Sequence, residues 1–427
     1  MSNRRVVITG MGTINPLGFD VESTWRALLQ CRSAIAPTHL FDASTFPTTF
    51  SAQVGDFDLA DYVRDPSLHA NAGRHCRFAL AAAAQAWKQA RLDAAENLDT
   101  DNMGIYLGGG EGSLDFQRFT SLLVEAWADG ELDTVKWAQL AFDRLNVNDE
   151  TEQESNMLLA HLAAEFDLHG PAFNCLTACA ASNQAIGEAS VLIRRGDVDA
   201  ALTGGAHSMI HPYGLAGFNR LTALSTRNDE AATASRPFEL SRDGFVLGEG
   251  STILVLEELE HAQARGAEVF AEIIGYGASA DAFRITDQDP EGDGAATAMR
   301  FALEEANLTP ADVDYVSAHG TGTKQNDQVE TRALKAVFGD LARKVPVSSV
   351  KSMIGHLIAA AGATELVTGV LALRDQVLPP TTNYFTPDPE CDLDYVPNEP
   401  RKAEVNVVMS NNFGFGGQNN TLILTRP

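Results

Sequence analysis

The chain has 427 residues, of which 44% are hydrophobic and 21% charged, a balance that supports one large or two medium globular domains. Its net charge of −26 argues against a nucleic-acid-binding or anionic-membrane-binding role, because such a field repels polyanions at long range. The five cysteines, at positions 31, 76, 175, 179 and 391, are odd in number and scattered, which argues against a disulfide framework.

Strand-like apolar runs alternate with alanine-rich helical runs, which predicts an α/β protein with layered sheets and helices. A first pass of this pattern covers residues 4–10, 78–90, 103–109, 178–195, 200–206 and 251–259. A second pass covers 268–279, 295–306, 313–320, 329–339, 345–350, 355–374, 403–413 and 419–426. We therefore expect two α/β halves, residues 1–257 and 258–427. The acidic, less regular segment 112–155 is interpreted as an insertion over the core.

Neither end of the pattern indicates a membrane protein. The start, "MSNRRVVITGMG", passes directly from two arginines into a strand-like run, unlike a secretory signal. The most apolar later stretch, "HLIAAAGATELVTGVLAL", contains Glu365 and two glycines and is not an unbroken span. A soluble, cytoplasmic protein is expected.

The stretch "GPAFNCLTACAASNQAIGEAS" (170–190) holds two cysteines four residues apart, Cys175 and Cys179. Residues 172–176 suit a short buried strand, and small residues recur with helical spacing from Ala178 to the stop at Gly196. Cys179 is thus predicted at a strand-to-helix turn. There the first free amides and the helix dipole favour the thiolate, which makes the sulfur a better nucleophile.

Three later stretches carry polar residues that structure alone does not require. In "VSAHGTGTKQND" an apolar strand ends at His319 and opens into a loop of glycines and hydroxyls. The stretch "SSVKSMIGHLIAAAGATE" contains Lys351 and His356, followed by an alanine-rich helix with Glu365. The glycines of "SNNFGFGGQNN" (410–420) let the backbone approach a ligand and turn amides toward an anion.

Together these groups are complete for acyl chemistry: a nucleophile, hydrogen-bond donors for an oxyanion, and a buried lysine–carboxylate pair. A zinc site fits less well, because Cys175 and Cys179 have no second ligand pair nearby. A dinucleotide fold is also disfavoured, since Gly10, Gly12 and Gly18 do not give the G-x-G-x-x-G spacing.

The motifs "TAC" with "GEA", "AHGTGT" before Asn326 and Asp327, "KSMIGH" with "AAGA", and "NNFGFGGQN" resemble those of the condensing enzymes of fatty-acid synthesis. The resemblance is closest to beta-ketoacyl-acyl-carrier-protein synthase II and extends over essentially the whole chain. It implies the thiolase fold, two duplicated α/β halves forming a five-layered αβαβα sandwich, and a homodimer.

Carried over residue by residue, the resemblance makes Cys179 the acyl-accepting nucleophile and Cys175 a buried strand residue. It implies that His319 and His356 bind the thioester carbonyl of the malonyl unit and stabilise its enolate. Lys351 would hold the electrostatics of the site. Glu365 would orient a loop or a water near the histidines, and Asp327 and Glu330 would support the site from behind the residues that touch substrate. Thr321 and Thr323 would bind the phosphopantetheine arm. The amides of Cys179 and Phe415 would form the oxyanion hole, and Phe413 would act as a gate between the acyl pocket and the malonyl site.

The implied reaction is a decarboxylative Claisen condensation. An acyl group on Cys179 is joined to malonyl-acyl carrier protein to give 3-oxoacyl-acyl carrier protein, two carbons longer, in fatty-acid elongation. The implied partners are acyl carrier protein and acyl and malonyl thioesters. No metal, nucleotide or flavin cofactor is required, because loss of carbon dioxide drives the reaction and the carrier supplies the phosphopantetheine arm.

Other assignments are weighed against this one. A thiolase needs a second cysteine near the C-terminus, but "FGFGGQNN" has none and Cys391 lies outside such a motif. A chain-length partner would lack the nucleophile, and a binding scaffold would leave the site idle. A ketosynthase of a secondary pathway, making a polyketide, polyene or unusual lipid, stays open because segment 112–155 is long, Gln418 replaces a threonine and Ile354 replaces the threonine of "KSMTGH".

Two further hypotheses concern partners and substrate. An acidic carrier protein would be repelled unless local basic residues overcome the net charge; candidates are Arg74, His75 and Arg77, and Arg220 with Arg227. Glu111, in "GGGEGS", aligns with an apolar acyl-pocket position of the family. A carboxylate there would disfavour long saturated acyl chains.

Overall fold

The computed structural model describes residues 4–95, 98–110, 115–285 and 287–427. Its main feature is a continuous ten-stranded sheet made of two five-stranded sheets with the same topology. The strands of the first are β1 (Val6–Ile14), β4 (Met103–Gly108), β7 (Ala172–Cys175), β8 (Ala200–His207) and β9 (Gly250–Glu258). Those of the second are β10 (Ala271–Ala280), β11 (Tyr315–Ser317), β12 (Val347–Ser348), β15 (Val407–Gly414) and β16 (Gln418–Thr425).

The two sheets repeat one strand order. In space the order is β7-β4-β8-β9-β1 in the first and β12-β11-β15-β16-β10 in the second, so each runs third, second, fourth, fifth, first along the chain. In each sheet the first two pairings are parallel and the other two antiparallel. The edges join where β1 pairs with β10 at residues 6–8. The predicted duplication is therefore present in strand order and direction.

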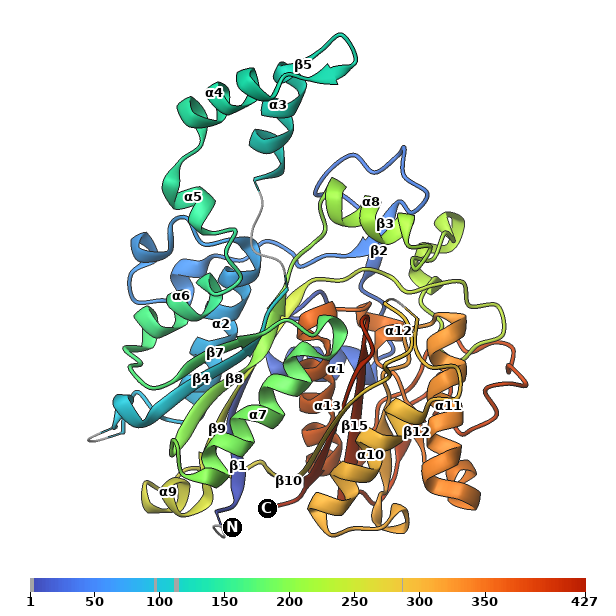
Figure 1. Ribbon diagram of the computed structural model, residues 1–427. Helices are drawn as coiled ribbons and strands as arrows, with labels where there is room; N and C mark the ends of the chain where they lie inside the picture. Colours follow the sequence, from blue (N-terminus) through green and yellow to red (C-terminus); the bar gives the residue numbers. More distant parts are fainter. Residues whose placement is uncertain (1–3, 96–97, 111–114, 286) are drawn as a thin grey trace.

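Helices complete five layers (Figure 1). The first outer layer contains α2 (Arg74–Gln89) and α6 (Met157–Phe166), packed on the first sheet. The central layer is formed by α7 (Ala181–Arg195) and α13 (Ala361–Asp375), which contact each other and both sheets. The second outer layer contains α10 (Asp293–Ala306), packed on β10 and β16, beside α11 (Lys324–Phe338). This is the predicted αβαβα sandwich.

The central helices are alanine- and glycine-rich because they have no solvent-facing side. In α13 every residue from Ala361 to Leu373 is buried, including Glu365. An α-helix buried all round reads as apolar all round, so a charged residue within it needs a buried partner. The remaining elements are α1 (Val21–Leu29), α8 (Pro212–Arg220), α9 (Leu259–Ala264), α12 (Lys351–Ile354) and the short strands β2 (Ile35–Pro37), β3 (Phe50–Ala52), β13 (Val377–Leu378) and β14 (Arg401–Lys402).

The segment expected as an insertion forms an arm that projects from the body instead of lying over it (Figure 1). Its described part contains α3 (Phe116–Ala126), β5 (Trp127–Ala128), β6 (Glu131–Leu132), α4 (Thr134–Arg144) and α5 (Val147–Thr151). Asp115, Asp133 and Asn146 cap its three helices through their side chains. The arm therefore has local order, and Leu122 and Ala126 of α3 are buried.

Among the described residues, no helix combines the length and the apolar character that crossing a membrane requires.

Candidate active site

Cys179 lies in the connection between β7 of the first sheet and α7 of the central helix layer. After β7, the backbone at Ala178 takes a positive φ of 47°, and a single 3-10 turn, Ala178–Ala180, leads into α7. A positive φ is uncommon for a residue other than glycine and is strained, a feature that often marks functional turns. The predicted strand-to-helix turn is therefore confirmed, and the Cys179 side chain is 4% exposed.

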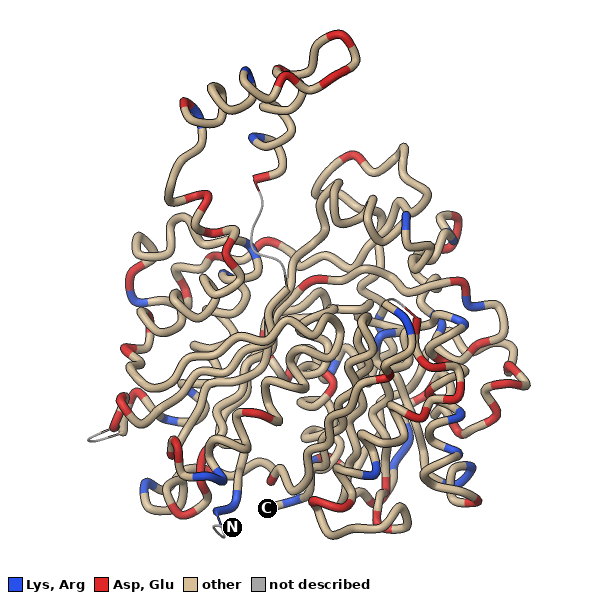
Figure 2. The backbone as a smooth tube through the Cα atoms, in the orientation of Figure 1, with Lys and Arg blue, Asp and Glu red and all other residues tan. Residues whose placement is uncertain are grey.

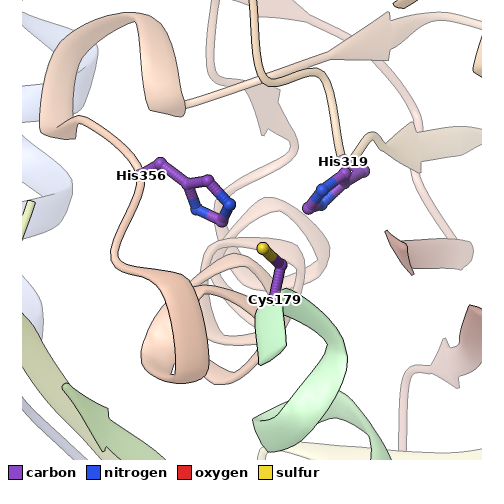
Figure 3. Close-up of side chains that lie close together, drawn as sticks. All are labelled: Cys179, His319 and His356. Atoms are coloured by element: carbon purple, nitrogen blue, oxygen red, sulfur yellow. The ribbon is translucent and has the colours of Figure 1, made fainter. Parts of the chain in front are cut away.

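His319 and His356 converge on this sulfur from the second half of the chain. His319 follows β11 by two residues, and His356 lies between α12 and the 3-10 turn Ile358–Ala360. One ring nitrogen of each histidine and the Cys179 Sγ all lie within 4.8 Å of one another. The three side chains point toward one another in Figure 3.

The hydrogen bonds of His319 identify its tautomer. Its Nδ1 lies 3.4 Å from the Lys351 Nζ and 3.4 Å from the Asn412 Nδ2. The Asn412 Nδ2 also donates to the Glu365 carboxylate at 2.8 Å, which fixes the orientation of the amide. An ammonium and an amide NH₂ can only donate, so Nδ1 accepts and the ring proton lies on Nε2.

His356 has the same tautomer for a different reason. The backbone N–H of Ile358 donates to its Nδ1 at 3.2 Å, so Nδ1 accepts and Nε2 carries the proton. The Nε2 has no hydrogen-bond partner among the described residues although it is buried. Burial lowers the pKa of both histidines well below the usual value, with Lys351 acting in the same direction. Two neutral imidazoles thus offer Nε2–H donors beside the Cys179 sulfur.

Lys351 and Glu365 form a fully buried ion pair. The Lys351 Nζ also donates to the backbone carbonyl of His319 at 2.5 Å, so it fixes both the ring and its backbone. Such a pair is strongly destabilising to break, because one unpaired charge would remain in the interior. Asn412, which links Glu365 to His319, was missed by the sequence analysis; its place within "NNFGFGG" was the only signal.

Two more buried carboxylates hold the loop that carries His319. Glu330 accepts the backbone amides of His319 at 2.8 Å and Gly320 at 2.7 Å, and burial raises its pKa to about 7. Asp327 accepts the amides of Gly322 and Phe238 and lies 3.2 Å from the Arg242 guanidinium. Burial raises the pKa of Asp327, and Arg242 opposes that shift. Through these contacts both carboxylates fix the backbone of the loop that carries His319.

Three cavities meet at Phe415. The innermost, about 40 Å³, is lined by Cys179, both histidines, Thr321, Thr323 and Phe413. A second, about 480 Å³, borders Thr323, Lys324 and Phe415, and a third, about 590 Å³, borders Cys179 and Phe415. The hydroxyls of Thr321 and Thr323 are 2.9 Å apart. The sulfur thus lines the innermost and the third cavity, and Phe415 borders all three.

Phe413 and Phe415 differ in environment. Phe413 is 2% exposed and its ring packs edge-on at 5.8 Å from the His319 ring, whereas Phe415 is 37% exposed. Between them, Gly414 faces the turn before the nucleophile, where a Cβ would lie 2.5 Å from the carbonyl oxygen of Thr177. Glycine therefore brings β15 against the Cys179 turn and places the Phe415 amide, which favours the thiolate, near the sulfur.

The expected low pKa of Cys179 is not found. Burial raises the pKa of its thiol to about 11, although Lys351 and the amides of Phe415 and Cys179 act in the opposite direction. Because both neighbouring Nε2 atoms already carry protons, neither histidine can accept the thiol proton in this tautomer. The resting site therefore holds a thiol, and removal of a sulfur from water outweighs the helix dipole.

Alkylation of Cys179 should report this pKa directly. Only the thiolate attacks iodoacetamide, so below the pKa the rate should rise about tenfold per pH unit from pH 7 to pH 9. Mass spectrometry of the tryptic peptide separates this cysteine from the others. A rate that levels off below pH 8 would show that the thiolate is the resting form.

The expected burial of the strand before Cys179, and of Cys175 within it, is wrong. The expectation for Glu111 concerns a residue that the structure does not describe. The predicted buried strand at 172–176 is instead the edge strand β7 (Ala172–Cys175), which is largely exposed: Phe173 is 47% exposed, and Leu176, just after the strand, is 59% exposed. Cys175 is accordingly half-buried, and its Sγ faces the carbonyl of Ala181 at 3.2 Å. Glu111 lies outside the described residues.

The predicted docking role of Arg74 conflicts with its contacts. Its guanidinium binds both oxygens of the fully buried Glu249, at 2.8 and 2.6 Å, and the carbonyl of Val54 at 2.8 Å. Arg74 is therefore a structural residue, and His75 is buried. Arg77 is exposed. Figure 2 shows lysines and arginines interspersed with acidic residues over the body.

Replacement of Arg74 with methionine should destabilise the protein by about 3 kcal/mol, because the Glu249 carboxylate would be left buried with its main counter-charge removed. Arg77→Met, at an exposed site one helical turn away, should change the free energy of unfolding by less than about 0.5 kcal/mol. Urea denaturation measures both. Equal free energies of unfolding for the two variants would contradict the structural role of Arg74 and support its role in docking.

The comparisons with known proteins agree with this geometry. A family model described as "Beta-ketoacyl synthase, N-terminal domain" matches residues 3–262, and "Beta-ketoacyl synthase, C-terminal domain" matches 270–385. The chain belongs to the beta-ketoacyl synthase family. The resemblance found in the sequence is confirmed, and this synthase is a condensing acyltransferase with the thiolase fold.

Individual relatives of this synthase cover its whole length. It is 44% identical to "3-oxoacyl-[acyl-carrier-protein] synthase 2" of Coxiella burnetii over 100% of this chain and 99% of that protein. A beta-ketoacyl synthase structure from Burkholderia phymatum STM815 is 35% identical, with a TM-score of 0.88 over 99% of this chain and 100% of the other. A type II polyketide ketosynthase, solved with its acyl-carrier protein and a hexaketide, is 31% identical, with a TM-score of 0.87 over 99% of each chain.

Proposed function

We propose that this synthase joins an acyl group carried on Cys179 to malonyl-acyl carrier protein, with loss of carbon dioxide, to give 3-oxoacyl-acyl carrier protein. The observation that carries the proposal is the convergence of two neutral Nε2–H donors, from His319 and His356, on a buried cysteine. Two fixed donors beside a nucleophile can stabilise an enolate at the position where the acyl thioester waits.

Acyl transfer comes first. The Cys179 sulfur bonds to the acyl carbonyl carbon, the carrier's C–S bond breaks, and the thiol proton leaves with the carrier's sulfur. The backbone amides of Cys179 and Phe415 stabilise the oxyanion of this step, consistent with their effect on the thiolate. No base is required, since the leaving group takes the proton.

Condensation follows in the same space. His319 and His356 donate to the malonyl thioester oxygen, the C–C bond to the carboxylate breaks, and the electron pair forms an enolate. The enolate carbon attacks the acyl carbonyl carbon, and the bond from that carbon to the Cys179 sulfur breaks. The thiolate released takes a proton from water, which restores the resting thiol. Lys351, Glu365 and the carboxylates of Asp327 and Glu330 hold the donors in place, Thr321 and Thr323 bind the phosphopantetheine arm, and Phe413 acts as the gate.

Fatty-acid elongation is the favoured pathway. The 44% identical relative is named 3-oxoacyl-[acyl-carrier-protein] synthase 2, whereas the polyketide ketosynthase is 31% identical. A ketosynthase of a secondary pathway would use the same residues and is less supported.

Acyl carrier protein is the proposed partner, as in the solved complex of the polyketide ketosynthase. Its phosphopantetheine arm is the only prosthetic group that the reaction needs. The arm would enter through the second cavity, where Lys324 is exposed at the rim. The proposal also includes a cytoplasmic location. It further divides the chain into two halves, residues 1–257 and 258–427.

A homodimer is supported by two exposed apolar surfaces. Among the described residues β7 pairs only with β4, so its outer edge, with Phe173, is open. The arm exposes Val124 at 70%, Phe142 at 94% and Val147 at 76%. Open strand edges and apolar patches of this kind are normally covered in proteins that do not aggregate. Two copies joined at their β7 edges would cover the open strand edge.

Replacement of Phe173 with lysine should shift the protein from dimer to monomer, because a charge would enter the pairing edge. Phe301→Lys is the matched control: that side chain is 49% exposed, on α10 at the opposite outer layer. Sedimentation equilibrium gives the mass of each. A monomeric wild-type protein would contradict the proposed homodimer and would leave the proposed reaction unaffected.

The reaction is tested with purified synthase, malonyl-acyl carrier protein and an octanoyl carrier thioester. The expected product is the 3-oxodecanoyl carrier, with one carbon dioxide released per product. Incubation with EDTA should leave turnover unchanged, a necessary control because the Cys179, His319 and His356 ligand atoms could also hold a metal ion. An acyl adduct on Cys179 without any 3-oxoacyl product would contradict the proposal.

A further inference from the structure

The third cavity, behind the nucleophile, is the space available to an acyl chain on Cys179. Its wall includes apolar side chains, among them Leu176, Met209 and Phe218. A cavity for a saturated chain is normally apolar throughout, apart from the groups that hold the thioester. This one also includes Gln153, Glu154, Ser155 and His207, and its lining is therefore partly polar.

His207 is the feature of this wall that the proposed mechanism does not use. It is the last residue of β8 and is 2% exposed. Neither ring nitrogen has a side-chain hydrogen bond to the described residues, and the Nε2 is buried without a partner. Burial lowers the pKa of this histidine to about 3, so the ring is neutral at pH 7.

The ring is accessible from the cavity at Gly110. A Cβ at that position would lie 2.7 Å from the His207 Nδ1 and 3.3 Å from Cε1. Both residues line the cavity, so a side chain at 110 would cover this edge of the ring. Because residue 110 is a glycine, the His207 Nδ1 stays accessible to an acyl chain in the cavity.

A buried polar group without a partner is unfavourable, and in native structures it calls for an explanation such as a ligand. A neutral imidazole can donate to or accept from a hydroxyl and can donate to a keto oxygen. A saturated acyl chain would displace any water from the His207 ring and could not replace the hydrogen bond to that water. Glu154 on the same wall disfavours a chain that ends in a carboxylate.

We propose that His207 is a specificity-determining residue, and that the acyl cavity takes chains carrying a neutral oxygen function, a hydroxyl or keto group, in preference to saturated chains of the same length. The inference rests on the proposed function, since it names the class of acyl donor for the same cysteine. It concerns the acyl chain alone and leaves the malonyl step unchanged.

The test compares acyl loading of Cys179 by matched carrier thioesters: octanoyl, and octanoyl with a hydroxyl at carbon 3, 5 or 7. Loading is followed by intact-protein mass spectrometry under single-turnover conditions. We expect at least one hydroxylated chain to load about tenfold faster than octanoyl, the scale of one net hydrogen bond. Octanoyl loading as fast as all three overturns the proposal.

His207→Leu should remove that preference, because leucine fills similar space and cannot hydrogen-bond. Met209→Leu, an apolar exchange on the same cavity wall, should retain it. A preference that survives in His207→Leu overturns the assignment of the residue. Absence of loading by every thioester, wild type included, would instead contradict the proposed function. The wild-type comparison needs no variant, so a misfolded variant leaves the test intact.

Discussion

Replacing Cys179 with alanine is expected to reduce condensation by at least about 10³-fold, to background, because only this sulfur can hold the acyl chain. Acyl loading should vanish with it. Release of carbon dioxide from malonyl-acyl carrier protein should continue, since the His319 and His356 donors do not depend on the sulfur for their positions: Lys351 and Asn412 hold one ring, and the Ile358 amide holds the other.

Cys175→Ala is the matched control. Cys175 lies four residues earlier, is half-buried, and has its pKa raised to about 12 by burial. Its variant should load acyl groups and condense at near wild-type rates. Each variant removes one sulfur, so thermal unfolding should shift by only a few degrees in both. An inactive Cys175→Ala beside an active Cys179→Ala would show that the nucleophile is misassigned.

The sequence was sufficient to identify most of the groups that the structure brings together at the candidate site. Cys179, His319, Lys351, His356 and Glu365 lie in short motifs whose residue types have few structural reasons to occur together. The alternation of strand and helix likewise predicted the layers, because a central helix layer buried on all sides must be rich in small apolar residues. Composition and motif spacing carry that kind of information.

What the sequence could not supply depends on contacts between distant segments. The exposure of β7 follows from its place at a sheet edge, which no local pattern reveals. Arg74 reads as a surface cation until Glu249, 175 residues away, is found against it. The pKa of Cys179 was mispredicted because the helix dipole is visible in sequence and the depth of burial is not.

The duplicated halves meet at the site with related turns. The backbone is at φ 47° at Ala178 and at φ 46° at Ile358, and each residue opens a 3-10 turn before a central helix. In the first half this turn carries Cys179. In the second, the amide of Ile358 holds the Nδ1 of His356. One strained turn, used twice, thus places the cysteine and fixes the tautomer of a donor.

This division of roles predicts how the histidines fail. His319→Ala or His356→Ala should lower condensation by about 10² or more, the usual cost of removing one oxyanion donor from a preorganised site. Carbon dioxide release should fall by the same factor, because the enolate is the species that both rings stabilise. Acyl loading of Cys179 should fall much less, since the amides of Cys179 and Phe415 serve that step.

Replacing His356 with asparagine separates donation from proton transfer. Asparagine has an N–H donor and no basic nitrogen, so it should recover part of the loss if the ring acts as a neutral donor. The pH profile of carbon dioxide release should also show no inflection near pH 6.5, because burial and Lys351 keep the pKa of both histidines well below that value. Loading of radiolabelled acyl groups that falls in parallel with carbon dioxide release in the alanine variants would contradict the separation of the two steps.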